Sequence, residues 1–213
     1  MSGFSLAELD RFHATPVPAE ASAEYRRLFV GWDDVHGALK YILSRPGLSS
    51  LTLSMFGYDD SELNDLVMGL VCDPSVLTMI TLDKSQAGGV HEKRLLDLDR
   101  KQNLAAFNAH FAIGQSATHS INHTKGGVVR FAGNAVAWEG STNWSTDGEG
   151  TFVLGRNQAG GPGYKAQNNT VVIDVNAWEV QRFEDRLRAE HMIAVQQSLA
   201  PKRTKPRAVK RVA

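Results

Sequence analysis

The order of helical and strand-like stretches constrains the fold of this chain more than any other feature. Apolar residues recur at helical spacing over 33–45, 60–71 and 90–111, and strand-like stretches lie between them, at 50–58 and 76–83. Alternation of this kind is typical of a sheet that helices cover on both faces. From residue 126 onward the pattern changes to strands and one last helix. The strands expected there are 126–133, 134–140 and 169–175, and the closing helix is 176–197.

These patterns predict an α/β fold, in which one mixed β-sheet is flanked by helices on both faces. Gly133 and Asn134 form the expected turn between the first two late strands. A stretch rich in Gly and polar residues, 146–169, is expected to form a long loop near the site. The chain is expected to divide into an N-terminal extension (1–27), a main domain (28–198) and a tail (199–213).

The basic residues of the chain are concentrated at its C-terminal end. The chain has 23 basic and 23 acidic residues, but 17 basic residues remain when the tail is set aside. The tail carries no acid, and we expect either a disordered arm that contacts phosphate backbones or one that is only solvated. Its basic residues are Lys202, Arg203, Lys205, Arg207, Lys210 and Arg211.

Composition also bears on the compartment. No stretch approaches the roughly 18 to 20 apolar residues of a membrane span, so no transmembrane segment is expected. The N-terminus lacks the basic and apolar regions of a signal peptide, which favours the cytoplasm. Cys72 is the single cysteine and cannot form an internal disulfide. Its apolar, helical surroundings predict a small, buried core residue.

The densest group of reactive side chains lies between residues 123 and 143. His123 and Lys125 are one residue apart, and Gly140-Ser141-Thr142-Asn143 follows after the two late strands. Residues two apart in a strand share a face, so His123 and Lys125 point to one place, as do Ser141 and Asn143. If the strands pair, these four side chains converge on one pocket. An ammonium group can neutralise a phosphate there, and a neutral imidazole can attack phosphorus.

This combination resembles the HKD signature of the phospholipase D superfamily. In that motif His-x-Lys is followed by an apolar strand, a turn, a second strand and Gly-Ser-x-Asn. The likeness extends over roughly residues 28–190, because further stretches are similar to other family elements in the right order. These stretches are LTLSMFGYDDSELNDLV (51–67), ITLDKSQ (80–86) and QNNTVVIDVNAWEVQRFEDRL (167–187).

The resemblance implies a phospholipase D-like fold, with residues 28–198 as the catalytic domain. It implies catalytic roles for the four motif residues and requires neither a metal nor another cofactor. The substrate of such an enzyme is a phosphodiester, and the reaction passes through a covalent phosphohistidine. The implied catalytic residues are His123, Lys125, Ser141 and Asn143.

The chain departs from the family pattern at two places. The Asp of the signature, seven residues after the His, is replaced by Arg130, or by Gly133 if the longer spacing is counted as an insertion. The family tends to have Glu or Asn just before the last strand, where this chain has Gln167, Asn168 and Asn169. We therefore expect Asn168 to bind substrate, and Glu149 to stand in for the supporting Glu. The tail residues expected to bind substrate are Lys202 and Arg203.

Two other histidine patterns have weaker support. His91-Glu92-Lys93 also spells His-x-Lys, but it lies in a helical pattern and no Gly-Ser-x-Asn follows. His119 and His123 have the i, i+4 spacing of a zinc-binding helix, but the segment leads into a strand and lacks a suitable third ligand. Neither pattern is expected to form a catalytic or metal site.

Three functions remain open after this comparison with the family. A metal-independent endonuclease acting on DNA or RNA is favoured, because small members with one motif are often nucleases. The alternatives are a phospholipase D-type hydrolase or transferase acting on phospholipids, and a catalytically inactive phosphate-binding module. Since a chain with one motif supplies one His, a homodimer with a shared active site is expected to supply the second.

Overall fold

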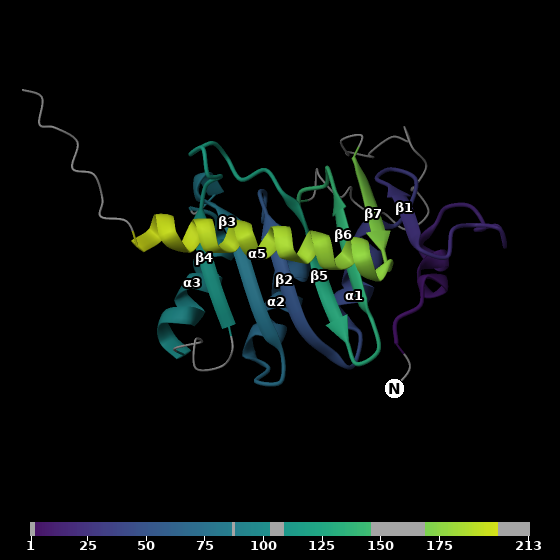
Figure 1. Ribbon diagram of the computed structural model, residues 1–213, viewed down its shortest axis with the longest axis horizontal. Coiled ribbons are helices and arrows are strands. Elements are labelled where there is room, and N and C mark those ends of the chain that lie inside the picture. Colours follow the sequence, from purple (N-terminus) through teal and green to yellow (C-terminus); the bar gives the residue numbers. More distant parts are fainter. Residues whose placement is uncertain (1–2, 87, 103–108, 146–168, 200–213) are drawn as a thin grey trace, which may run out of the picture.

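The structure, a computed structural model, describes residues 3–86, 88–102, 109–145 and 169–199. The strands of these residues form one sheet in the order β1-β7-β6-β5-β2-β3-β4 (Figure 1). β2, β3 and β4 are parallel to one another, and the other neighbouring pairs are antiparallel. The strands are β1 (Tyr25–Phe29), β2 (Leu48–Met55), β3 (Leu77–Asp83), β4 (Ala109–Gly114), β5 (Lys125–Phe131), β6 (Ala135–Gly140) and β7 (Thr170–Asp174).

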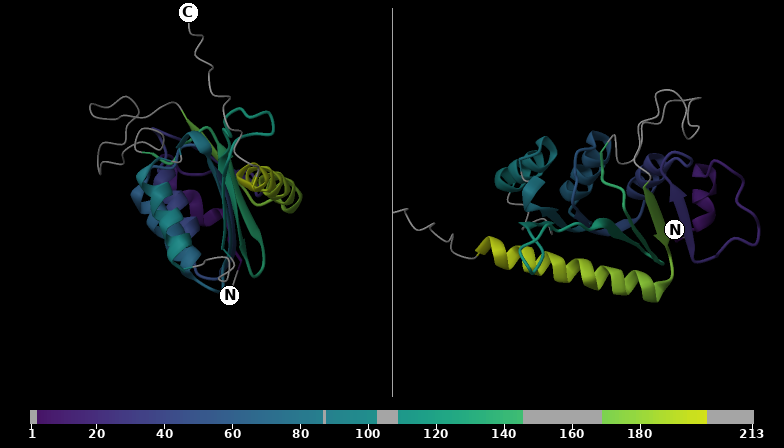
Figure 2. Two further views of the ribbon diagram at one scale, coloured as in Figure 1. Left: turned by 90° about the vertical axis from the view of Figure 1, so that its left-hand side faces the viewer. Right: turned by 90° about the horizontal axis from the view of Figure 1, so that it is seen from above.

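Helices cover both faces of the sheet, as Figure 2 shows. Three of them lie on one face, and α5 crosses the strands on the other (Figures 1 and 2). The predicted α/β fold, a mixed sheet flanked by helices on both faces, is confirmed. The helices are α1 (Val35–Ser44), α2 (Ser61–Cys72), α3 (Val90–Gln102) and α5 (Ala177–Leu199), with short 3-10 helices at η1 (Leu6–Phe12) and η2 (Lys84–Gln86).

Short polar side chains fix where the helices begin. The Asp60 carboxylate accepts a hydrogen bond from the backbone N–H of Leu63 at 2.7 Å, which caps α2. Asn176 caps α5 in the same way, since its Oδ1 accepts the backbone N–H of Glu179 at 3.2 Å. Each contact satisfies a backbone donor that has no partner within its own helix. The caps therefore set the residue at which α2 and α5 each begin.

The two faces of the sheet are packed with different chemistry. The face under α1, α2 and α3 holds the main apolar core, which includes Leu39, Leu53 and Val129. The face under α5 has a small apolar cluster, beside which polar side chains are buried. The members of that cluster are Val128, Ala137, Val180 and Leu187. Burying polar groups costs free energy unless they are hydrogen-bonded, so α5 is held partly by specific polar contacts.

Glu184 is the most enclosed of these polar groups on α5, with 0% of its surface exposed. Burial raises the pKa of its carboxyl, but hydrogen bonds and charge from Arg130 and Arg188 outweigh burial and hold the pKa below its usual value. Arg130 comes from β5, so this ion pair ties α5 to the middle of the sheet. Glu184 Oε1 also accepts the Thr52 hydroxyl of β2 at 3.3 Å.

One predicted helix is partly wrong. The sequence predicted a single helix over 90–111, but α3 ends at Gln102 and Ala109–Gly114 forms β4. β4 pairs in parallel with β3, from Thr78 opposite Ala109 to Asp83 opposite Gly114. Short apolar runs fit a helix or a strand equally well, and here pairing with a neighbouring strand decides between them. Residues 103–108 lie outside the described part of the chain.

The prediction that Cys72 is a buried core residue is also wrong, because its side chain is exposed. The buried face of α2 is formed by Leu63, Val67 and Val71. Cys72 follows Val71 by one residue, which places it about 100° further around the helix axis. The apolar stretch in the sequence therefore continues past the stripe that faces the core.

The first 29 residues contribute to the sheet and to the main core. β1 was not predicted, and it pairs antiparallel with β7 at the edge of the sheet. Phe4, Leu6 and Leu9 are buried in the main core. The boundary expected at residue 27 falls inside β1. The boundary expected at 198/199 meets the end of α5 at Leu199, beyond which the structure does not describe the chain.

Candidate active site

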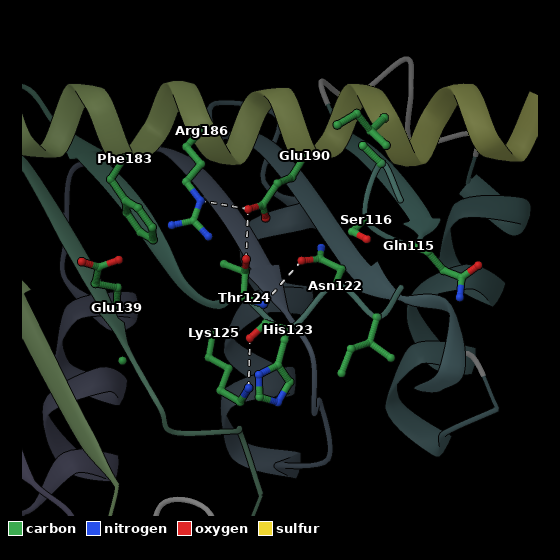
Figure 3. Close-up of a pocket in the computed structure, with 14 residues that line it drawn as sticks. Gln115, Ser116, Asn122, His123, Thr124, Lys125, Glu139, Phe183, Arg186 and Glu190 are labelled. Atoms are coloured by element: carbon green, nitrogen blue, oxygen red, sulfur yellow. Dashed lines mark hydrogen bonds and ion pairs between the residues drawn. The ribbon is translucent and has the colours of Figure 1, made fainter. Parts of the chain in front are cut away.

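His123 and Lys125 lie at the beginning of β5, where that strand runs beside the end of β2. Lys125 is the first residue of β5 and pairs with Met55, the last residue of β2. Figure 3 shows the two side chains side by side, on the side of the strand that faces away from α5. His123 is exposed, whereas Lys125 is 6% exposed. The predicted convergence of this pair is therefore present.

Phe56 supports both side chains. The imidazole of His123 meets its ring edge-on, with ring centroids 4.8 Å apart. The ammonium nitrogen of Lys125 lies 5.1 Å from the centre of the same ring, within the range of a cation–π contact. Lys125 Nζ also donates a hydrogen bond to the carbonyl of His123 at 3.0 Å. The backbone N–H of Phe56 bonds to the carbonyl of Thr124 at 2.9 Å, which holds the ring against the pair.

The second half of the motif reaches the same stretch of chain after β2. Trp144 donates its backbone N–H to the carbonyl of Gly57 at 2.9 Å and accepts the N–H of Asp59. The Asn143 side chain packs so closely on Gly57 that a Cβ there would lie 2.8 Å from its Cγ. Residues 56 and 57 thus lie between His123 and Lys125 on one side and Asn143 on the other, and Gly57 allows that approach.

Ser141 and Asn143 differ in their surroundings. The Ser141 hydroxyl accepts the backbone N–H of Thr170 at 3.1 Å, so it joins the ends of β6 and β7. Oδ1 of Asn143 is buried and has no hydrogen-bond partner among the described residues. Buried polar atoms are nearly always hydrogen-bonded, so this open oxygen or amide makes Asn143 a candidate for binding a ligand. Asn143 therefore has the surroundings of a ligand-binding residue, and Ser141 has those of a structural one.

The ammonium group of Lys125 is buried, where a positive charge is poorly hydrated. Burial lowers the pKa of its ammonium group below that of an ordinary lysine, because the charged form has lost part of its hydration. No carboxylate forms an ion pair with Lys125 within the described residues. A bound anion would restore the missing stabilisation. Lys125 is thus a candidate for binding a negative group.

Arg130, at the position of the signature Asp, lies on the other face of β5. It forms its ion pair with Glu184 of α5, and its guanidinium also donates to Gln181 at 2.7 Å. Strand alternation places residue 130 on the α5 face and Lys125 on the opposite face. The replacement of the Asp therefore changes a contact between sheet and helix and leaves the surroundings of Lys125 intact.

A cleft of about 460 Å³ lies beside the pair, between the strand ends and α5. His123 and Lys125 line it from β5, and Gly140 lines it from the end of β6. Phe183, Arg186 and Glu190 of α5 form the opposite wall (Figure 3). Ser141 and Asn143 are not among its lining residues, so this cleft does not gather all four predicted side chains. Asn143 reaches the motif segment through Gly57, whereas the Ser141 hydroxyl binds the backbone of Thr170.

Four predicted substrate-binding residues lie outside the described part of the chain, and their roles stay predictions. They are Glu149, Asn168, Lys202 and Arg203. The neighbouring Asn169 is described and is buried, and its carbonyl accepts the backbone N–H of Val30 at 3.0 Å. Phe56, Asp83, Asn122 and Glu190 were not predicted as site residues. Asp83 lies in ITLDKSQ, one of the stretches similar to the family, which was the one sequence signal for it.

The two weaker histidine patterns lie in a helix and in an irregular segment. His91 lies in α3, as its helical pattern predicted, and 4.0 Å separates its Nε2 from an Asp59 carboxylate oxygen. His119 and His123 are in an irregular segment that precedes β5, where His119 has a φ of 61°. Among the described residues no three His, Cys, Asp or Glu side chains are grouped to hold a metal ion.

Comparisons with known proteins place the backbone among solved structures. No protein-family model and no curated protein sequence matches the chain. Its backbone is similar to that of NucT from Helicobacter pylori, with a TM-score of 0.55 and 12% identity over 78% of this chain and 94% of that one. It is also similar to a phospholipase D family member, Nuc from Salmonella typhimurium, with a TM-score of 0.50 and 11% identity over 78% and 92%. The chain has the phospholipase D fold.

The phospholipase D fold also relates the chain to part of a larger protein. Phosphatidylserine synthase from Haemophilus influenzae matches with a TM-score of 0.53 and 9% identity, over 83% of this chain and 40% of that one. The chain thus matches NucT and Nuc over nearly their whole length, and the synthase over less than half.

In the described residues, no helix has the length and apolar character needed to cross a membrane.

Proposed function

We propose that the protein is a metal-independent phosphodiesterase, and that it hydrolyses nucleic-acid phosphodiester bonds as an endonuclease through a covalent phosphohistidine. The observation that carries this proposal is the meeting of His123, Lys125 and Asn143 around Phe56 and Gly57 in a phospholipase D fold. A nucleophile, a cation and a carboxamide can each take part in displacement at a phosphodiester.

In the proposed reaction, Lys125 and Asn143 bind the nonbridging oxygens of the phosphate. An imidazole nitrogen of His123 attacks phosphorus with its lone pair. The N–P bond forms, the P–O bond to the leaving group breaks, and the leaving oxygen takes a proton from a second acid. Water then attacks phosphorus and gives a proton to that same group, now a base. The N–P bond breaks, and neutral His123 is restored.

The second acid in this proposal is His123 of a second copy of the chain. A two-fold axis beside the strand ends would bring both imidazoles to one phosphate, in a homodimer with a shared active site. Asn168 and Glu149 would contact the substrate beside them. Lys202 and Arg203 of the tail would contact phosphates further along a nucleic acid.

Nucleic acid is preferred over phospholipid for two reasons. The chain matches NucT and Nuc over 94% and 92% of their lengths, whereas it covers 40% of phosphatidylserine synthase. The tail, with six basic residues and no acid, fits a polyanion better than a single headgroup.

The alternative of an inactive phosphate-binding module rests on the loss of the signature Asp. Arg130 lies on the α5 face, which removes most of that support.

The first experiment is plasmid nicking in EDTA, run beside hydrolysis of phosphatidylcholine vesicles. Wild-type protein should nick the plasmid and leave the lipid intact. His123→Ala should lose on the order of 10³-fold or more in rate while keeping its fold, because the nucleophile is gone. Acid-labile phosphate should be trapped on His123 of the wild type.

His119→Asn is the matched control, because His119 is an exposed histidine of the same segment and Asn adopts its positive φ readily. This variant should keep wild-type activity. Full activity in His123→Ala would refute the mechanism. Hydrolysis of the vesicles without nicking would assign the lipid function instead, and no turnover of either substrate would leave the inactive module.

A further inference from the structure

Two carboxylates from different elements bind the residues on both sides of His123. The first is Asp83, the last residue of β3, which is 0% exposed. Its Oδ1 accepts the backbone N–H of Ser85 at 2.8 Å and the Ser85 hydroxyl. Its Oδ2 accepts the backbone N–H of Asn122. A buried carboxylate with donors on both oxygens has little freedom to move, so it fixes the backbone one residue before His123.

The second carboxylate is that of Glu190, in α5. Its Oε1 accepts the Thr124 hydroxyl at 3.0 Å, and Arg186 Nε donates to the same oxygen at 3.1 Å. Its Oε2 accepts the hydroxyl of Ser54, in β2, at 3.0 Å. Glu190 thus binds Thr124, between His123 and Lys125 (Figure 3), and the neighbouring strand β2 at once.

Asn122 connects the two carboxylates. Its side-chain Nδ2 donates to the Ser54 hydroxyl at 3.1 Å, while its backbone is bound to Asp83. Asn122 and Ser54 are both buried, with 8% and 0% of their surfaces exposed. The chain of contacts therefore runs from β3 through Asn122 and Ser54 to α5 without passing through solvent. Networks of this kind are rigid when every member has its partner.

The network of Asp83, Asn122, Ser54 and Glu190 can set the direction of the two motif side chains. Thr124 points toward Glu190, whereas His123 and Lys125 point away from α5 (Figure 3). Because successive side chains alternate, holding residues 122 and 124 sets the direction of residues 123 and 125. No described contact joins Asp83 or Glu190 to the imidazole or the ammonium group. The carboxylates act through Asn122 and Thr124.

We propose that Asp83 and Glu190 are positioning residues, which hold His123 and Lys125 in the geometry for attack by binding Asn122 and Thr124. This inference rests on the proposed function, since the geometry matters to a reaction at His123. The similarity of ITLDKSQ to the family then has a structural explanation, because its Asp83 accepts the backbone N–H of Asn122 in the motif segment. Glu190 has no counterpart in the predictions made from the motif.

The test uses substitutions that remove one hydroxyl and keep the size of the side chain. Thr124→Val removes the contact with Glu190, and Ser54→Ala removes the link to Asn122. Thr52→Val is the matched control, because its hydroxyl joins β2 to Glu184 of α5 away from the motif. The thermal stability of all three is measured, so that a general loss of stability is recognised by comparison with Thr52→Val.

Thr124→Val and Ser54→Ala should lower kcat for plasmid nicking by about 10- to 100-fold and leave KM nearly unchanged, because a displaced nucleophile acts on the reaction and not on binding. Thr52→Val should keep the wild-type kcat. Asp83→Asn and Glu190→Gln should lower kcat in the same direction. Wild-type kcat in Thr124→Val, or an equal loss in Thr52→Val, would overturn the proposal.

A second readout does not depend on turnover. The ring signal of His123 in a ¹H–¹³C NMR spectrum is assigned by its loss in His123→Ala. It should shift or broaden in Thr124→Val and Ser54→Ala and stay in place in Thr52→Val. If the wild-type protein cleaves neither plasmid nor lipid, the proposed function fails, and this spectrum alone decides the positioning. An unchanged His123 signal in Thr124→Val would then overturn it.

Discussion

A buried lysine defines the site at the scale of single residues. Lys125 is 6% exposed, and burial holds the pKa of its ammonium group below that of an ordinary lysine. A buried ammonium group without a counter-ion is unfavourable, and a bound anion would offset this loss of hydration. The site therefore favours substrates that bring their own negative charge. His123 beside it is exposed.

This predicts an alkaline limit to activity. The value of kcat/KM reports ionisations of the free enzyme, and it should fall where Lys125 loses its proton, below the pH of an ordinary lysine. The limit in kcat should lie at higher pH, because a bound phosphate raises the pKa of the ammonium group. Lys125→Arg should be slower and should lack the limit in kcat/KM, since a guanidinium keeps its proton. Lys84→Arg is the control, and the same alkaline limit in Lys125→Arg would contradict this assignment.

At the scale of the elements, α3 carries a buried acid in its first turn. Glu92 in the first turn of α3 is 1% exposed, and one of its carboxylate oxygens has no hydrogen-bond partner among the described residues. Burial raises the pKa of Glu92 to about 7, and the nearby charge of Asp59 adds to the effect. In the unfolded chain the group would titrate near its ordinary value of 4.5. The folded state therefore holds the proton more tightly than the unfolded state.

The free energy of unfolding should for this reason fall as the pH rises from about 4.5 to about 7. In that interval the unfolded chain binds fewer protons than the folded one. Glu92→Gln should stabilise the protein above pH 7, by at most about 3 kcal/mol, and should have no such effect below pH 4. Urea unfolding at several pH values measures this, with Glu179→Gln on the surface of α5 as control. An equal effect of Glu92→Gln at all pH values would contradict it.

The whole molecule has one motif, and the proposed reaction needs a nucleophile and a separate group that acts first as acid and then as base. In the proposed homodimer, the second imidazole would come from the other copy of the chain, across an interface of loops and strand ends around residues 120–145. Two Lys125 side chains would then face one another, so a bound anion should stabilise the dimer. Light scattering with and without inorganic phosphate measures this.

Mixing experiments test the sharing of the site. Heterodimers of wild-type and His123→Ala chains should lose most of their activity, because one imidazole cannot be both nucleophile and acid in a single turnover. Heterodimers with His119→Asn chains are the control and should stay active. A monomer that is fully active at assay concentration would contradict the shared site.

The sequence by itself determined the class of the fold and the residues of the motif. Helical and strand periodicities are local properties, and the spacing from His123 to Asn143 is read directly from the chain. The two faces of β5 also follow from alternation, which predicted that His123 and Lys125 share a direction. These inferences needed no knowledge of what each strand pairs with.

The tertiary structure decided what depends on partners far apart in the chain. Ala109–Gly114 is a strand because β3 lies beside it, and Cys72 is exposed because the buried stripe of α2 ends at Val71. Asp83 and Glu190 belong to the site because β3 and α5 bring them to Asn122 and Thr124, from 39 and 66 residues away. Hydrogen bonds over such distances leave no periodic pattern in a sequence. They form when packing has already set the position of each element.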